Sequence, residues 1–405
     1  MKRLIPTRPS LGILALVAVL ALVGCASKAA PPTPNPIPSV RPAPVTPAAT
    51  TAVTSGPSST RPLPVPLPTS GTWRRLPPAP ILAGMYQAVW TGTEMLVHRA
   101  NGRTGRGSAN AAYNPATTTW RRLPSSPYPV KSGEGGTQIV WDGTELLTFG
   151  VMNAALDPAI GRWRPLTAPP VPAASVVLWT GTRVLIWGGG CCGDARAEGA
   201  AYDPATDRWT VLPRSPLAGR HAEGVWTGAE MVIVGGQTAD GVAFADAAAY
   251  NPATGSWRKL PPLPAPRYAA TLTWTGREVL VVGGKRSAES VPYADGYAYD
   301  PARDRWRRLP AMESGRSRHI AVWTGHHLLV WGGRTQSSPL TDPVAPPHGL
   351  VLDPATGRWT ALPKAPIRAR TGAFGVWTGT DMLIWGGAGI TEPFPQYLDG
   401  AGYRP

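Results

Sequence analysis

Phenylalanine and charged residues are scarce in this chain. Phe occurs four times in 405 residues and Asp, Glu, Lys and Arg together make up 16%, whereas Gly (46), Pro (48) and Trp (17) are abundant. Helical bundles tolerate few glycines and prolines, so this composition argues against them. It favours an all-β protein in which many short strands are joined by tight turns.

Long apolar runs are also nearly absent. The one candidate is Leu11–Gly24, and its 14 residues are fewer than the roughly 20 that a transmembrane helix needs. It follows the basic residues Lys2, Arg3 and Arg8. This arrangement is typical of a signal peptide, which we assign to residues 1–24.

The apolar run ends in Leu22-Val23-Gly24-Cys25, which resembles the bacterial lipobox. The resemblance implies that Cys25 is lipidated with a diacylglyceryl group and becomes the first residue of the mature chain. Two acyl chains anchor a protein firmly, since each buried CH₂ contributes about 0.8 kcal/mol. We therefore expect an exported protein, lipid-anchored to the outer face of a bacterial cell membrane and touching the membrane through this anchor only. The alternative is an ordinary secretory signal followed by a chance cysteine.

Cysteine is rare. Besides Cys25 the chain holds only the adjacent pair Cys191 and Cys192. In an exported protein we expect this pair to be oxidised. Neighbouring Cα atoms lie about 3.8 Å apart, below the usual disulfide range, so a vicinal disulfide would be strained. Such a bond would either shape a binding loop or act as an inert staple.

Catalytic and metal-binding motifs are missing. The six histidines show no metal-ligand spacing, and the sequence contains no Gly-x-Ser-x-Gly elbow and no phosphate-binding loop. We therefore assign no catalytic residue, no metal ligand and no cofactor.

Residues 25–70 form a Pro/Ala/Thr-rich segment. Its residues 26–70 hold 13 prolines without apolar periodicity, so they cannot bury a core and favour extended polyproline II geometry. At about 3.1 Å per residue the segment could reach on the order of 140 Å. We interpret it as a disordered stalk that carries the lipidated cysteine; a merely tolerated linker is the alternative.

The chain is basic, with a formal net charge of +15. Lys2, Arg3 and Arg8 of the signal peptide account for three of these charges, which leaves +12 for residues 25–405. A basic balance suits anionic cell-wall polymers, lipid headgroups or nucleic acid. The exported location excludes nucleic acid, so the expected partner is a glycan, an anionic cell-wall polymer or another protein.

From residue 71 onward the sequence repeats itself. A Trp followed by Thr-Gly or Asp-Gly recurs at Trp90, Trp141, Trp179, Trp226, Trp274, Trp323 and Trp377. A second Trp, within a short W-(R/T)-x-L pattern, recurs at Trp73, Trp120, Trp163, Trp209, Trp257, Trp306 and Trp359. Spacings of 38–54 residues in the first series are in the range of β-propeller blades. The two series predict seven blades.

Each repeat divides into four strands. The Thr-Gly pair is expected to form a tight turn between the first two, and Asn/Asp-Pro-Ala a turn between the last two. Gly161, Gly255 and Gly357 follow the second turn, where a bulge needs a left-handed residue. The seventh repeat lacks a fourth strand, and residues 71–80, beginning GTWRRLP, are expected to supply it and to close the ring.

Two further features resemble the kelch family. Gly pairs follow the second strand at Gly188-Gly189, Gly235-Gly236, Gly283-Gly284, Gly332-Gly333 and Gly386-Gly387. Tyr precedes Trp by a fixed distance in Tyr113/Trp120, Tyr202/Trp209, Tyr250/Trp257 and Tyr299/Trp306. Leu156 and Leu352 replace Tyr in two repeats, blade one has His98-Arg99-Ala100 in place of Gly-Gly, and blade two keeps only Gly150. The resemblance implies that residues 71–405 form a seven-bladed kelch-like β-propeller, similar to the central domain of galactose oxidase. WD-repeat propellers are the other candidate, but their Gly-His…Trp-Asp signature is absent.

Any binding site is expected on one face of the propeller. The turns within the first and last strand pairs are short and nearly uniform, whereas the other connections vary and meet on the opposite face, where binding usually occurs. Four of them bring basic residues to the channel mouth: Arg220-His221, Arg267-Tyr268, Arg318-His319 and Arg370. A ring of guanidinium groups would bind carboxylates or phosphates. Structural arginines, frequent at this point in kelch repeats, are the alternative.

The sequence thus predicts a monomeric, surface-anchored binding or interaction module for a carbohydrate or another anionic cell-envelope ligand. A sugar-converting enzyme, epimerase- or lyase-like, stays open, because the sialic-acid epimerases are also kelch propellers with basic central sites. A structural scaffold of an envelope complex is the third class. Galactose oxidase uses copper and a crosslinked Tyr-Cys pair, for which no lone cysteine is suitably placed here. A Glu or His beside several Arg in the mouth would favour an enzyme.

Overall fold

The computed structural model describes residues 70–81, 86–100, 108–130, 137–171, 175–190, 195–335, 348–389 and 395–405. These residues belong to one compact unit, Leu63–Pro405. Within these ranges the chain forms 28 strands and no helix, and hence no helix that could cross a membrane. Cys25, the stalk up to residue 69 and the pair Cys191-Cys192 lie outside the described residues, so their assignments stay predictions.

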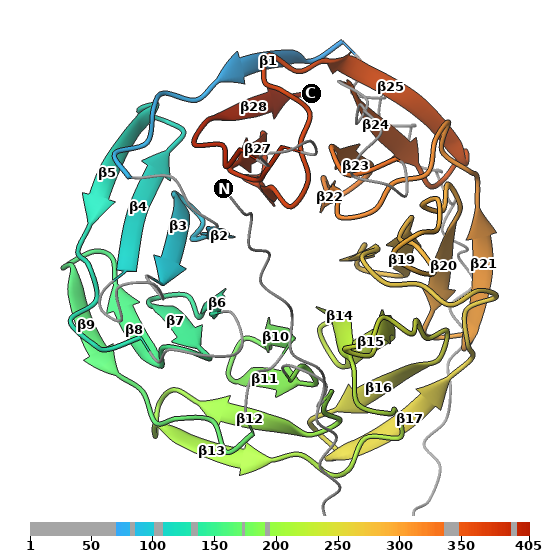
Figure 1. Cartoon of the computed structure of the whole chain (residues 1–405), viewed down its shortest axis with the longest axis horizontal. Coiled ribbons are helices and arrows are strands. Elements are labelled where there is room, and N and C mark those ends of the chain that lie inside the picture. Colours follow the sequence, from blue (N-terminus) through green and yellow to red (C-terminus); the bar gives the residue numbers. More distant parts are fainter. Residues whose placement is uncertain are drawn as a thin grey trace, which may run out of the picture. The chain divides into compact units, whose positions relative to one another are not determined.

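The strands form seven four-stranded antiparallel sheets. These are arranged around a central channel as the blades of a ring, with the first strand of each blade innermost (Figure 1). The structure therefore confirms the predicted all-β, seven-bladed propeller.

The blades follow one another in chain order. Blade one comprises β2 (Gln87–Trp90), β3 (Met95–Ala100), β4 (Ser108–Asn114) and β5 (Thr119–Leu123). Blade two comprises β6 (Gln138–Trp141), β7 (Leu146–Phe149), β8 (Ala154–Asp157) and β9 (Arg162–Pro165). Blade three comprises β10 (Val176–Trp179), β11 (Val184–Trp187), β12 (Gly199–Asp203) and β13 (Arg208–Val211). Blade four comprises β14 (His221–Trp226), β15 (Met231–Gln237), β16 (Ala247–Asn251) and β17 (Ser256–Leu260).

The remaining strands complete the ring. Blade five comprises β18 (Thr271–Trp274), β19 (Val279–Val282), β20 (Gly296–Asp300) and β21 (Arg305–Leu309). Blade six comprises β22 (Ile320–Trp323), β23 (Leu328–Trp331), β24 (His348–Asp353) and β25 (Arg358–Lys364). Blade seven comprises β26 (Phe374–Trp377), β27 (Met382–Trp385), β28 (Gly400–Arg404) and β1 (Thr72–Arg75).

The N-terminal strand lies in the last blade. β1 pairs antiparallel with β28, with Trp73 opposite Tyr403, so a segment from each end of the propeller forms blade seven. β1 thereby pairs with the edge of β28 that would otherwise be open, and blade seven has four strands like the other six. In Figure 1 the blue β1 lies beside the red β28.

Second strands are mostly apolar because a neighbouring blade packs on each face. In β11, β23 and β27 every residue is buried. Each hydrophobic cluster joins two adjacent blades; Leu185 of blade three and Ile233 of blade four, both fully buried, belong to one of them. Continuous apolar runs are what a sheet buried on both faces requires.

The second Trp of each repeat links its blade to the preceding one. Its indole N–H donates to a backbone carbonyl there at 2.7–3.0 Å in all seven blades. Trp73 makes this bond to Pro363 and Trp120 makes it to Pro77, so the contact continues through the closing blade. The pattern W-(R/T)-x-L therefore marks a repeated contact between blades as well as core packing.

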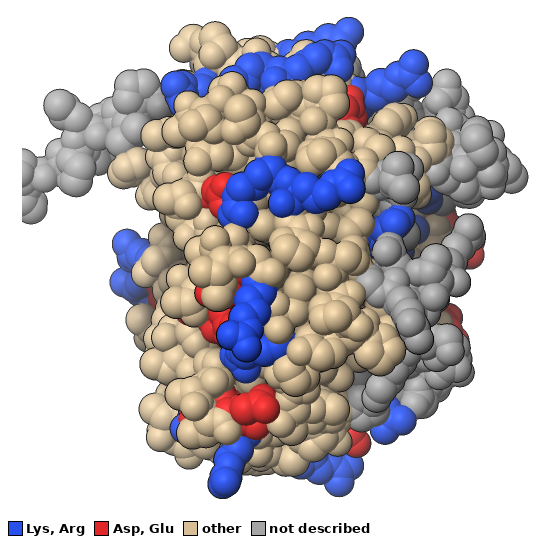
Figure 2. All heavy atoms as spheres, turned by 90° about the vertical axis from the view of Figure 1, so that its left-hand side faces the viewer, with Lys and Arg blue, Asp and Glu red and all other residues tan. Residues whose placement is uncertain are grey.

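The outer strands carry arginines that pair with an acid in the first turn of the same blade. These pairs are Arg121–Glu94, Arg164–Glu145, Arg258–Glu230, Arg307–Glu278 and Arg74–Asp381. Figure 2 shows basic patches on the rim beside acidic side chains. Thr210 and Thr360 replace the arginine in blades three and six, where Arg183 and His327 replace the acid. Solvent-exposed ion pairs contribute at most about 1 kcal/mol each. The Arg74–Asp381 pair differs from the other four because the Asp381 carboxylate is buried.

Candidate functional site

Three of the four arginines expected at the channel mouth are buried. Arg220, Arg267 and Arg370 are at most 1% exposed. Their guanidinium groups donate at 3.0–3.3 Å to the carbonyl of the first Gly of the Gly-Gly pair, at Gly235, Gly283 and Gly386. They form ion pairs with the Asp that precedes the third strand, at Asp246, Asp295 and Asp399. Each also lies 3.6–4.5 Å from the centre of an aromatic ring, of Phe244, Tyr293 and Tyr397.

This arrangement corrects the expected ring of guanidinium groups. Arg220, Arg267 and Arg370 fix the loop that follows the Gly-Gly pair, and none of them lines the channel cavity described below. A buried guanidinium needs its charge balanced inside the protein, and these ion pairs balance it. Nε and Nη2 of Arg267 and Nη2 of Arg370 have no hydrogen-bond partner among the described residues. The structural interpretation of these three arginines therefore holds.

The fourth buried arginine is Arg316, not Arg318. Arg316 is fully buried and donates to the Gly332 carbonyl at 3.3 Å. His348 occupies the position of the aspartate, and among the described residues the ion-pair partner of Arg316 is Glu313, 3.7 Å from the guanidinium. Burial lowers the pKa of Arg316 to about 10. Arg316 is seven residues before Trp323, the distance that also separates Arg267 from Trp274, whereas Arg318 is only five before it.

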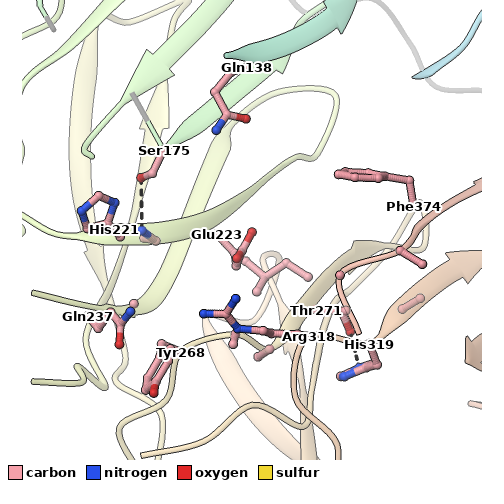
Figure 3. A pocket seen from close by; sticks show the side chains of 18 residues that line it. Gln138, Ser175, His221, Glu223, Gln237, Tyr268, Thr271, Arg318, His319 and Phe374 are labelled. Carbon is pink, nitrogen blue, oxygen red and sulfur yellow. Dashed lines mark hydrogen bonds between the residues drawn. The ribbon is translucent and has the colours of Figure 1, made fainter. Parts of the chain in front are cut away.

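Arg318 is exposed and points into the channel cavity (Figure 3). Its backbone is left-handed, with φ of 52°, and its N–H donates to the carbonyl of Ala269 at 2.9 Å. Ala269 and Gly372 occupy the same place in blades five and seven and are left-handed too. Among the described residues no hydrogen bond or ion pair engages the Arg318 guanidinium. It is the one member of the predicted set with a free cationic group in the cavity.

The cavity has a volume of about 570 Å³ and lies at the channel mouth. Blades two to seven contribute to its wall. The polar or aromatic lining side chains are Gln138, Ser175, His221, Glu223, Gln237, Tyr268, Thr271, Arg318, His319 and Phe374 (Figure 3). His221, Tyr268 and His319 of the predicted set therefore lie in the site together with Arg318.

The two histidines and the tyrosine differ in environment. His319 is 7% exposed, and its Nε2 lies 3.0 Å from the Thr271 hydroxyl oxygen. Burial, and then the charge of Arg316, lower the pKa of His319 to about 3, so this imidazole is neutral near pH 7. Burial raises the pKa of Tyr268, which keeps its phenol protonated. His221 is half-buried in the wall.

Glu223 is the acidic residue of the cavity. It lies on β14, and Figure 3 shows its carboxylate beside Arg318. The surrounding blades desolvate the carboxylate and raise its pKa, while the positive charge of Arg318 opposes this shift. The side chain is still exposed to the channel, so water there limits the size of the shift. Glu223 can accept hydrogen bonds when ionised and donate one when protonated.

Glu223 was not predicted from the sequence. Its position could have revealed it, because it is the single acidic residue in the seven inner strands. A carboxylate on the innermost strand of a propeller must face the channel or a neighbouring blade, and burial between blades would leave it unpaired.

The comparison with known proteins assigns the family. The sequence profile of the Attractin/LZTR1 β-propeller family matches residues 173–390, more than half of the chain. The chain belongs to the Attractin/LZTR1 β-propeller family. As a member it is a kelch-type β-propeller, which is in general a binding or interaction module.

Among solved structures, a fungal alcohol oxidase of the AA5 family in complex with copper is similar to this Attractin/LZTR1-type propeller. Its TM-score is 0.62 at 16% identity, and the match covers 83% of this chain and 76% of the oxidase. At that identity the likeness shows the fold alone. No curated protein matches the sequence.

No three His, Cys, Asp or Glu side chains in the described part of this propeller lie close enough to hold a metal ion. The cavity offers the imidazoles of His221 and His319, and Nε2 of His319 is already within hydrogen-bond distance of Thr271. The lining side chains can form hydrogen bonds, and Arg318 and Glu223 bring ionisable groups to the cavity.

Proposed function

We propose that this propeller is an exported, lipid-anchored module that binds an anionic carbohydrate in the channel cavity. The observation that carries the proposal is Arg318, an exposed guanidinium in a cavity that is also lined by polar, aromatic and small apolar residues. A planar guanidinium binds a carboxylate or phosphate through two parallel hydrogen bonds.

The rest of the cavity supports a sugar as the neutral part of the ligand. The amides of Gln138 and Gln237 and the hydroxyl of Thr271 offer donors and acceptors for hydroxyl groups. Phe374 and Tyr268 offer apolar surface for the face of a ring. A volume of about 570 Å³ is within the range of small-molecule sites.

The backbone at Arg318 supports a binding role for this side chain. A left-handed arginine is strained by roughly 1 kcal/mol, which a glycine, as at Gly372 in blade seven, would avoid. Strained residues of this kind cluster at binding and active sites. In blade six the strained backbone is at Arg318, the residue whose side chain enters the cavity.

The N-terminus supports the location. Leu22-Val23-Gly24-Cys25 follows a short apolar run and basic residues, the pattern on which lipid anchoring is proposed. The net charge of +12 for residues 25–405 is compatible with a surface rich in anionic polymers. The anchor would hold the cavity near such ligands.

The test is a glycan and cell-wall-fragment array probed with the full-length protein in detergent. We expect acidic glycans to bind and Arg318→Met to weaken their binding by about tenfold or more, since a charge-assisted hydrogen bond is worth about 1.5–3 kcal/mol. Arg208→Met, which removes an exposed arginine from β13, is the matched control and should bind like the wild type. Preferred binding of neutral glycans, or an Arg318→Met variant with unchanged affinity, would overturn the proposal.

Glu223 favours one second candidate, a sugar-converting enzyme of the epimerase or lyase type. A carboxylate with a raised pKa beside an arginine is the arrangement expected for proton transfer to or from a bound sugar acid. Incubation of the array hits with the protein in deuterated water, followed by NMR, would reveal exchange or a new product. For the enzyme, Glu223→Gln should keep binding and abolish conversion; binding without any conversion supports the module alone.

A further inference from the structure

Two more basic residues, Lys285 and Arg334, do not line the cavity but pair through their backbones with residues at its wall. Each follows a Gly-Gly pair at the end of a second strand. Lys285 and Tyr268 exchange backbone hydrogen bonds at 3.0 Å, and Arg334 and Ser317 do the same at 2.8–2.9 Å. Tyr268 lines the cavity and Ser317 directly precedes Arg318. These pairings bring Lys285 and Arg334 next to the cavity wall.

Lys285, Arg318 and Arg334, here called the rim cluster, repel one another. The Lys285 residue is only 8% exposed; burial lowers its pKa, and the charges of Arg318 and Arg334 lower it further. Burial and the charge of Arg318 also lower the pKa of Arg334. Like charges held together cost free energy, and an anion bound among them would remove that cost.

Carboxylates do not balance the rim cluster. Among the described residues no salt bridge joins any of its three members to an acid. Glu289 acts on Lys285, and Glu223 on Arg318, through longer-range attraction only. Lys285 Nζ donates to the Ala288 carbonyl at 2.9 Å, which leaves other donors on this ammonium.

Arg334 also has an unused donor. Its Nε is buried, and within the described ranges no acceptor lies within hydrogen-bond distance of it. A buried guanidinium nitrogen without a partner is costly. The rim cluster therefore combines excess positive charge with unpaired donors beside the cavity.

We infer that the rim cluster binds a phosphate group, and that the ligand of the channel cavity is a phosphorylated sugar. The inference rests on the proposed anionic-carbohydrate function and names its ligand class. A phosphate monoester carries about −1.5 to −2 charges near pH 7 and three acceptor oxygens, which suits three cations better than a singly charged carboxylate. Arginine forks and a lysine ammonium are both common phosphate ligands. The sugar would occupy the neighbouring cavity beside Gln138, Gln237 and Phe374.

The test is isothermal titration of the full-length protein in detergent with inorganic phosphate, acetate, glucose and glucose 1-phosphate. We expect phosphate to bind at least tenfold more tightly than acetate, and glucose 1-phosphate more tightly than phosphate or glucose. Lys285→Met and Arg334→Met should each weaken phosphate binding by tenfold or more. Lys259→Met, which removes an exposed lysine from the outer strand β17, is the control with the same change of charge and should bind like the wild type.

Equal affinity for phosphate and acetate, or unchanged phosphate binding in both rim variants, would overturn the inference. If acidic glycans then still bind in an Arg318-dependent manner, the proposed function survives and the phosphate subsite falls. Because Lys285 is nearly buried, a thermal melt accompanies each titration. If the Lys285→Met variant is unfolded, phosphate binding by the Arg334→Met variant decides the test, because Arg334 is only half-buried. Rim-dependent binding of phosphatidylglycerol vesicles without binding of glucose 1-phosphate would replace the sugar phosphate by a lipid headgroup and contradict the inference.

Discussion

Arg316 and Arg318 lie two residues apart in the segment that enters β22, and their surroundings are opposite. The Arg316 guanidinium is buried against the Gly332 carbonyl, as Arg267 is against Gly283 in blade five. The Arg318 side chain is exposed in the cavity. The role of an arginine in this propeller is therefore set by its distance from the inner-strand Trp and by the conformation of its backbone.

The two roles are separable by substitution. Arg267→Met leaves Asp295 without its partner, and losing one member of a buried pair costs about 3–5 kcal/mol. Asp295 is partly exposed, so we expect the low end of that range and a clearly lower melting temperature. Arg318→Met should leave the melting temperature within about 2 °C of the wild type, because exposed substitutions change stability little. Equal shifts in the two thermal melts would contradict this assignment.

Buried neutral histidines should make the propeller sensitive to acid. His98 is 1% exposed; burial lowers its pKa to about 4, against the opposing effect of its Nδ1 contact with Asn110 Oδ1 at 2.7 Å. A pKa below the unfolded value of 6.5 means that the folded state disfavours the proton. The contribution of the neutral His98 imidazole to the free energy of unfolding is therefore fully present above pH 6.5 and is lost as the pH falls toward 4.

The measurement is denaturant unfolding from pH 7 to pH 4. Stability should fall over this window, and His98→Gln should have a shallower slope, because one fewer proton is taken up on unfolding. The comparison of slopes isolates His98 from His319, whose pKa is lowered to about 3, and from Glu223, whose raised pKa acts in the opposite direction. Identical slopes for the variant and the wild type would exclude the account of His98.

At the scale of elements, the two Trp series contained enough information to count seven blades. Each Trp pattern corresponds to a strand and a contact that recur in every blade, as the indole bonds of Trp73 and Trp120 show. The cavity could not be predicted in this way. Gln138, Glu223 and Phe374 lie far apart in sequence and belong to three blades, and only ring closure brings them to one channel.

The assumed equivalence of Arg318 with the three buried arginines was wrong for a related reason. Arg318-His319 repeats the dipeptide Arg220-His221, and the local match suggested equivalent positions. In the segments that enter blades five to seven, one residue is left-handed, and the buried arginine lies two positions before it. In blade six the left-handed residue is Arg318 and the buried arginine is Arg316. Dipeptide identity does not reveal that offset, whereas spacing to the inner-strand Trp does.

The closing strand β1 should contribute far more stability than the stalk. Deleting residues 71–80 removes Trp73, its hydrogen bond to Pro363 at 2.9 Å and its ring contact with Tyr403 at 4.9 Å. Loss of a fully buried Trp costs about 3–5 kcal/mol, and Trp73 is partly buried against the core of blades six and seven. Deleting residues 31–60 removes only Pro-rich chain and should leave the melting temperature unchanged. Equal melting temperatures for the two deletions would rule out this role of β1.

At the scale of the whole molecule, positive charge is distributed between paired and free sites. On the outer rim, pairs such as Arg121–Glu94 and Arg307–Glu278 balance much of it. Six of the 39 Lys and Arg residues and none of the 24 acidic residues precede Leu63. Within the described ranges, Arg318 in the cavity and Lys285 and Arg334 near it form no ion pair, and the proposed anionic ligand rests on this excess of positive charge.

The proposed anchor makes a prediction for the whole chain. Cys25→Ala should release the protein from the membrane fraction, because the 14-residue run Leu11–Gly24 is too short to span a relaxed bilayer. The measurement is fractionation of cells followed by a carbonate wash, with the wild type as control. A variant that stays in the washed membranes would contradict lipid anchoring through Cys25.

The most direct test of the central claim is a crystal structure of the full-length protein with the acidic glycan that binds most tightly. The account predicts that an anionic oxygen of the glycan lies about 3 Å from the Arg318 guanidinium, inside the channel cavity and beside Glu223. A glycan bound on the outer strands, or on the opposite face at the Thr-Gly turns, would contradict it.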